Sequence, residues 1–199
     1  MNRLIPRIGA GIVCVTVALF ALCMLIGFDF GSYFVCMLLP IGYIMLAAGF
    51  AHECDASRKV ASNVGMVLAA VYAVLVLLVY FAQNTSVRLD GLGEQALGIL
   101  DFKRGGLMFS YDLLGYGTMA LSTFFIGLGI SPKNRADRWL KGLMMLHGVF
   151  FLSCFILPMT GLLGGSSDGI GGVVALEFWC AYFLPIGVLA FRHFAPRER

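Results

Sequence analysis

The sequence has little charge. Of its 199 residues, 13% are Asp, Glu, Lys or Arg and 60% are hydrophobic, whereas soluble proteins carry roughly 25% charged residues. The mean hydropathy is +0.90. A chain of this composition cannot cover its exterior with polar side chains, which excludes a water-soluble globular domain.

Motifs of cofactor and metal chemistry are also missing. The six cysteines show no CxxC spacing, and the chain contains no HExxH and no P-loop. His147 is expected near the membrane midplane, whereas His52 and His193 fall at the cytoplasmic ends of predicted spans. A bis-His haem or a metal site with three or four ligands lacks the residues it needs, so we expect no cofactor and no metal.

Long apolar runs dominate what is present. A helix of about 20 residues crosses the roughly 30 Å hydrocarbon core of a bilayer. The runs predict an all-α, polytopic membrane bundle formed by a single transmembrane domain over residues 1–199. The expected spans are 8–27, 33–53, 60–82, 107–130, 138–159 and 173–194. In the longest connection, 83–106, the segment GEQALGILDF predicts a short interfacial helix.

The basic residues are distributed unequally between the two sides. With a cytoplasmic N-terminus, three of the 14 lie outside, namely Arg88, Lys103 and Arg104. The other basic residues lie in cytoplasmic segments, so the positive-inside rule predicts that both termini are cytoplasmic. Because these charges are spread over four short segments, we expect contact with anionic lipid head groups and no binding of nucleic acid.

Two acids interrupt the apolar spans. Asp112 lies about five residues, or roughly 8 Å, below the outer start of its span, and Glu177 lies at a similar depth in the last span. An unpaired carboxylate in hydrocarbon costs at least about 2.5–3.5 kcal/mol, so each acid needs a partner, a proton or water. Their equal depth predicts a shared polar cavity that opens outward.

Other polar side chains gather at the same depth. Tyr111, Tyr116, Tyr80 and Gln83 are the further candidates for a ligand-binding set with the two acids, while the cytoplasmic halves of the spans are mostly apolar. This asymmetry favours a dead-end pocket over a through-pore. His147 would be a relay below the acids or, alternatively, a neutral histidine hydrogen-bonded to a neighbouring helix.

Three functions stay open at this point. The first is binding or transport of a small molecule or ion that enters from the outer side. The second is a structural or accessory subunit that packs on a membrane protein partner, with the acids paired to Arg88, Lys103 or Arg104. The third is a membrane-embedded enzyme that uses Asp112 and Glu177 as an acid/base pair. We expect binding or transport rather than enzymatic activity.

Three segments carry a resemblance to other proteins. YFAQNTSVR (80–88), DLLGYGTMALSTFF (112–125) and RWLKGLMMLHGVFF (138–151) resemble a group of small bacterial multi-pass membrane proteins with no assigned activity. The resemblance covers the second half of the chain best. It implies a location in the bacterial cytoplasmic membrane and implies nothing about mechanism.

Overall fold

The computed structural model describes residues 1–160 and 170–196, and all regular elements in them are helical. The long helices are α1 (Leu4–Leu25), α2 (Asp29–Glu53), α3 (Lys59–Ala82), α5 (Leu107–Gly129), α6 (Arg135–His147), α7 (Phe150–Met159) and α8 (Ile170–His193). The short elements are η1 (Ala56–Arg58), the π-helical η2 (Gln83–Val87), α4 (Glu94–Leu100) and η3 (Phe102–Arg104).

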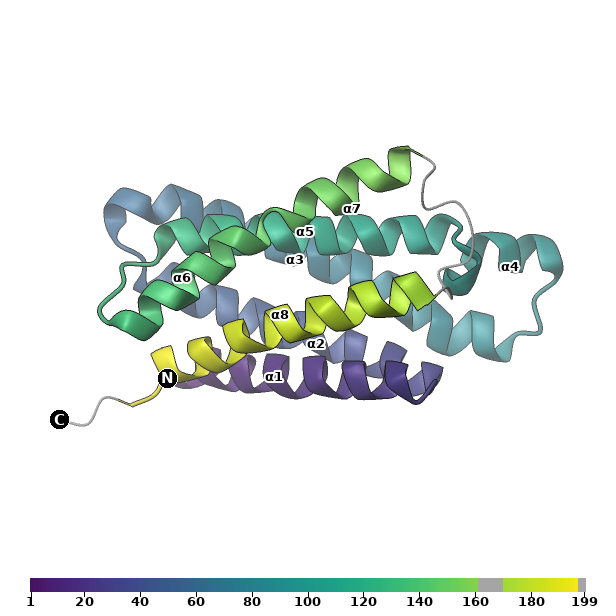
Figure 1. The fold of residues 1–199 in the computed structure, drawn as a ribbon, viewed down its shortest axis with the longest axis horizontal. Coiled ribbons are helices and arrows are strands. Elements are labelled where there is room, and N and C mark those ends of the chain that lie inside the picture. Colours follow the sequence, from purple (N-terminus) through teal and green to yellow (C-terminus); the bar gives the residue numbers. More distant parts are fainter. Residues whose placement is uncertain (161–169, 197–199) are drawn as a thin grey trace.

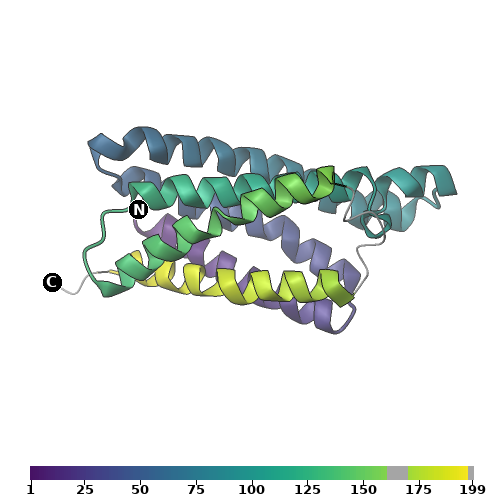
Figure 2. The ribbon, with the colours of Figure 1, turned by 45° about the horizontal axis from the view of Figure 1, so that its top comes forward.

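The long helices run lengthwise beside one another (Figures 1 and 2). Helix α1 begins and α8 ends at one end of the bundle, which we call the termini end, while α4 projects from the opposite end, which we call the α4 end (Figure 1). The most extensive helix contacts are α3 with α5 and α1 with α2; α2 also packs on α3, and α8 on α1. This arrangement places α2, α3 and α5 around a common interior.

Five helical segments are long and apolar enough to cross a membrane: Leu4–Leu25, Asp29–Glu53, Ala56–Val87, Arg135–Met159 and Gly172–His193. They indicate a multi-pass membrane protein, as the composition predicted. The expected span over 107–130 is not among the five, although α5 contains 23 residues. Serines, tyrosines, glycines and Asp112 lower the hydropathy of α5, which packs against α3, α6 and α7.

The span expected over 138–159 is not one uninterrupted helix. Helix α6 ends at His147 and α7 begins at Phe150, and both run from the termini end toward the α4 end (Figure 1). At the break the backbone N–H groups of Gly148 and Val149 donate to carbonyls three residues earlier. A Cβ on Gly148 would lie 2.9 Å from the Cβ of Phe124, so close contact with α5 requires glycine there. The predicted interfacial helix corresponds to the seven-residue α4.

Candidate functional site

The Asp112 side chain faces the interior of the bundle. It is 4% exposed, and its Oδ1 atom is buried without a hydrogen-bond partner. Tyr80 of α3 is a neighbour of the same carboxyl group. The extensive contact between α3 and α5 covers this face of α5. The carboxyl group is therefore enclosed by protein.

The outer basic residues have other partners. Lys103 Nζ lies 2.7 Å from Asp29 Oδ2, and Arg104 Nη1 lies 2.7 Å from Glu94 Oε2. The hydrogen bond from Arg104 holds the pKa of the exposed Glu94 carboxyl below its usual range. Arg88 lies over the ring of Phe30 at 4.9 Å. Within the described chain no ion pair links any of these residues to Asp112, so the contacts do not support a salt bridge that ties the outer loop to this acid.

An aromatic layer lies between Asp112 and the α4 end. The ring of Tyr33 lies 5.6 Å from that of Tyr80 and 6.1 Å from that of Phe102, and Phe102 lies 5.4 Å from Phe109. Gln83 fixes this layer to α3, because its Nε2 donates to Leu100 O at 2.8 Å and its Oε1 accepts from Phe102 N at 3.0 Å. Gln83 therefore uses its amide to hold the loop.

From Asp112 toward the termini end, side chains with hydroxyl groups line the interior of the bundle. The Tyr116 hydroxyl lies 3.9 Å from Cys36 Sγ, and its ring lies 5.6 Å from that of Tyr72. Tyr72 lies edge-on to Tyr43 with ring centroids 5.7 Å apart. Tyr43 donates to Ser122 Oγ at 2.9 Å, and Ser122 donates to the Gly65 carbonyl at 2.6 Å. Tyr80, Tyr116, Tyr72, Tyr43 and Ser122 form the set that we call the hydroxyl row.

The contacts of His147 define its tautomer. The Trp179 indole N–H donates to His147 Nε2 at 3.0 Å, so this nitrogen carries a lone pair. Nδ1 then carries the proton and donates to Thr123 Oγ1 at 2.7 Å, while Thr123 donates to the Ala120 carbonyl. His147 is thus a neutral histidine with both ring nitrogens hydrogen-bonded. This fits the expected alternative to a relay, namely a histidine that is hydrogen-bonded to a neighbouring helix. These contacts do not supply a relay step.

Glu177 and Tyr111 are more exposed than Asp112. Glu177 is half-buried on α8, where its Oε1 is buried without a hydrogen-bond partner and its neighbour is Cys180 on the same helix. Tyr111 is 39% exposed and faces outward. No hydrogen bond joins Glu177 Oε1 or Asp112 Oδ1 to any described residue, so the two acids do not contact each other through these atoms. Of the predicted set, the structure brings Asp112, Tyr80 and Tyr116 together.

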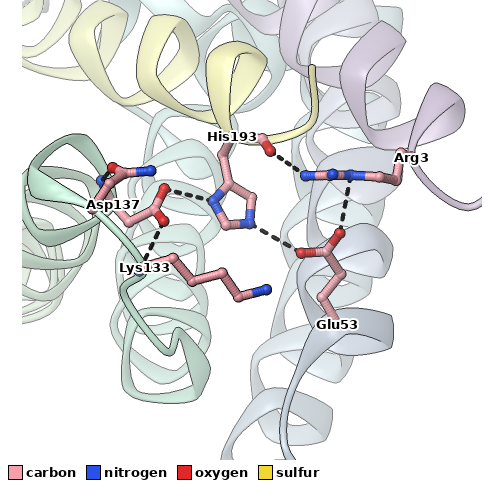
Figure 3. Close-up of polar contacts among 6 residues, drawn as sticks. Arg3, Glu53, Lys133, Asp137 and His193 are labelled. Atoms are coloured by element: carbon pink, nitrogen blue, oxygen red, sulfur yellow. Dashed lines mark hydrogen bonds and ion pairs between the residues drawn. The ribbon is translucent and has the colours of Figure 1, made fainter. Parts of the chain in front are cut away.

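A second polar cluster joins four helices at the termini end (Figure 3). His193 lies between two carboxylates, with Nδ1 2.8 Å from Asp137 Oδ1 and Nε2 3.1 Å from Glu53 Oε2. Arg3 Nε lies 3.3 Å from Glu53 Oε1, and Arg3 also donates to the His193 carbonyl. Asp137 accepts from the Lys133 backbone N–H. This cluster connects α1, α2, α6 and α8 and closes the bundle at that end.

Sequence reasoning missed Tyr72, Tyr43 and Cys36 of the interior and the partners of His193. One available signal was the spacing of Tyr72 and Tyr80, which are eight residues apart and therefore lie on one face of a helix. Among the described residues, no group of three or more His, Cys, Asp or Glu side chains could hold a metal ion.

No protein-family model, no curated protein and no solved structure matches this chain.

Proposed function

We propose that this is an integral membrane protein of the bacterial cytoplasmic membrane that binds a small cationic molecule or an ion at Asp112 and helps to carry it across. One observation carries the proposal: a carboxyl group inside the bundle is 4% exposed, and among the described residues it has no Lys or Arg partner and leaves one oxygen without a hydrogen bond. A purely structural acid in this position would be expected to have an ion-pair partner.

The energetics support a role in taking up positive charge. An ionised carboxylate at this depth costs at least about 2.5–3.5 kcal/mol, and that cost is removed when the group takes up a proton or a cation. Tyr80 and Tyr116 beside it offer hydroxyl groups and aromatic faces, and both features suit a cation. The ligand would enter from the α4 end, past the aromatic layer that Gln83 holds in place.

The proposal includes six spans with both termini in the cytoplasm. It adds α5 to the five apolar segments, because α5 has 23 residues and packs along α3. Helices α3 and α6 begin at the termini end (Figure 1), with Lys59 and Arg135 as their first residues and with Arg58 and Lys133 just before them. Arg88, Lys103 and Arg104 lie in the connection between α3 and α5, at the α4 end. The positive-inside rule supports a cytoplasmic termini end.

Carbodiimide labelling tests the site. Dicyclohexylcarbodiimide enters apolar regions and modifies carboxyl groups in their protonated form. We expect modification of Asp112 in the purified protein, located by peptide mass spectrometry, and a decrease when pH rises or when choline or Na⁺ is added at constant pH. Glu177 is the internal comparison, and Asp112→Asn is the negative control.

The alternatives give different results in the same experiment. Modification of Asp112 that does not respond to pH, choline or Na⁺ would contradict the proposal and favour the accessory subunit with a structural acid. An acid/base enzyme would need Asp112 and Glu177 to act on one substrate. The different neighbours of these two residues do not support that geometry.

A further inference from the structure

The buried polar groups of this protein are concentrated where α2, α3 and α5 meet. Asp112 and Tyr116 come from α5, Tyr80 and Tyr72 from α3, and Tyr43 from α2, and the side chains other than Tyr116 are at most 4% exposed. Ser122 of α5 is fully buried and continues the row. Asp112 and Ser122 are ten residues apart on α5, which corresponds to about 15 Å along the helix axis. This distance is about half the thickness of the hydrocarbon core.

Several buried atoms around this interior have no hydrogen-bond partner among the described residues. They are Asp112 Oδ1, the Tyr72 hydroxyl and the Ser62 hydroxyl, which lies one turn beyond Gly65 toward the termini end. Buried polar groups are almost always hydrogen-bonded to protein or to ordered water, because leaving one unpaired costs about 1–3 kcal/mol. Three unpaired groups around this interior suit internal water molecules that bridge the hydroxyl row.

We propose that the ion handled at Asp112 is a proton, and that the hydroxyl row with bridging water molecules conducts it between Asp112 and the termini half of the bundle. This inference rests on the proposed function of Asp112 and names its substrate. The geometry argues for a path rather than a closed pocket, since polar atoms continue past the midpoint of α5 to Ser122 and then to Ser62 on α3.

The transfer needs no reaction partner. Asp112 accepts a proton from the α4 end and releases it to the neighbouring hydroxyl or water. Each oxygen of the row accepts one proton from its neighbour and releases its own to the next, so only O–H bonds break and form. Ser122 now donates to the Gly65 carbonyl, and in the proposed path its hydroxyl group rotates and passes the proton to a water molecule on the termini side.

Proton flux in proteoliposomes tests the path. The full chain is reconstituted with an internal pH-sensitive dye, and a K⁺ gradient with valinomycin supplies the driving potential. The central variant is Tyr72→Phe, because this hydroxyl forms no hydrogen bond to a described residue, so its removal should leave the thermal stability unchanged. We expect the flux to fall by about tenfold, equivalent to about 1.4 kcal/mol in the barrier.

Two further variants make the comparison specific. Tyr43→Phe removes the donor to Ser122 and should also slow the flux. Tyr182→Phe is the matched control, because its hydroxyl donates to the Leu143 carbonyl on α6, away from the row, and this variant should conduct at the wild-type rate.

Two results would overturn the path. One is wild-type flux in both Tyr72→Phe and Tyr43→Phe; the other is a wild-type protein that conducts no faster than empty vesicles. The carbodiimide experiment separates this failure from failure of the proposed function: labelling of Asp112 that responds to choline or Na⁺, without proton flux, keeps the binding site and rejects the proton path.

Discussion

At the scale of single residues, His147 shows how a polar side chain can have all its hydrogen bonds satisfied inside an apolar bundle. It is 1% exposed, and its two nitrogens have different partners, the Trp179 indole and the Thr123 hydroxyl. An indole N–H can only donate, so a neutral imidazole is the form that satisfies both contacts. Because α5, α6 and α8 meet at these three side chains, His147 links helices that are far apart in sequence.

Substitution of His147 therefore predicts a loss of stability. His147→Leu leaves the Trp179 N–H without an acceptor and should lower the free energy of unfolding by about 1–3 kcal/mol. His147→Gln keeps an acceptor within reach of Trp179 and should lose less. The measurement is the midpoint of thermal unfolding in detergent, monitored by circular dichroism. A His147→Leu protein of wild-type stability that loses proton flux would contradict the structural role and restore the relay.

At the scale of helices, close packing depends on glycine at the crossing of α1 and α2. A Cβ on Gly9 would lie 2.6 Å from the Gly42 carbonyl oxygen and 2.9 Å from Leu46 N, both backbone atoms. Backbone cannot move aside as a side chain can, so the whole helix would have to shift. Small residues that allow helix backbones to approach are a usual means of packing in membranes.

We therefore expect Gly9→Ala to separate the two helices locally and to destabilise the protein by about 1–3 kcal/mol, the usual range for overpacking. Gly142→Ala on α6 is the matched control, because nothing lies within 4 Å of its Cβ position. Alanine is the better helix former by about 1 kcal/mol, so this control should be neutral or slightly stabilising. Equal thermal midpoints for the two variants would contradict the close crossing.

Helix positions were predictable from the sequence, whereas helix neighbours were not. The apolar runs located α1, α2, α3, α5 and α8 within a few residues, because the bilayer thickness determines their length. That Asp112 lies inside the membrane stays a prediction, and the structure shows its side chain buried inside the bundle. The pairing of Asp112 with Glu177 assumed that equal depth means proximity. Their surroundings depend on which helix faces which, and α8 packs on α1 and α6.

The break between α6 and α7 was missed for a related reason. Hydropathy is high through Gly148, and the whole segment Arg135–Met159 is apolar enough to span a membrane. The break coincides with the place where Gly148 touches Phe124 of α5, and this tertiary contact has no signal in the local pattern. Similarly, periodicity showed that Tyr72 and Tyr80 share a face, but only the packing of α2 and α5 brings Tyr43 and Tyr116 to them.

At the scale of the whole molecule, the two ends of the bundle differ in charge and in construction. The termini end holds the His193 cluster of Arg3, Glu53, Asp137 and Lys133, which joins four helices. At the α4 end, the Lys103–Asp29 ion pair and the Gln83 amide attach the connection between α3 and α5 to α2 and α3.

This asymmetry makes the orientation testable with single exposed cysteines. Gln95 on α4 and Arg135 at the start of α6 are both exposed and lie at opposite ends of the bundle. In intact cells a membrane-impermeant maleimide should label Gln95→Cys and should label Arg135→Cys only after permeabilisation, with the unsubstituted chain as the background for its six native cysteines. The reverse pattern would contradict the orientation. It would also place Asp112 near the cytoplasmic surface, so that the proposed proton uptake would begin inside the cell.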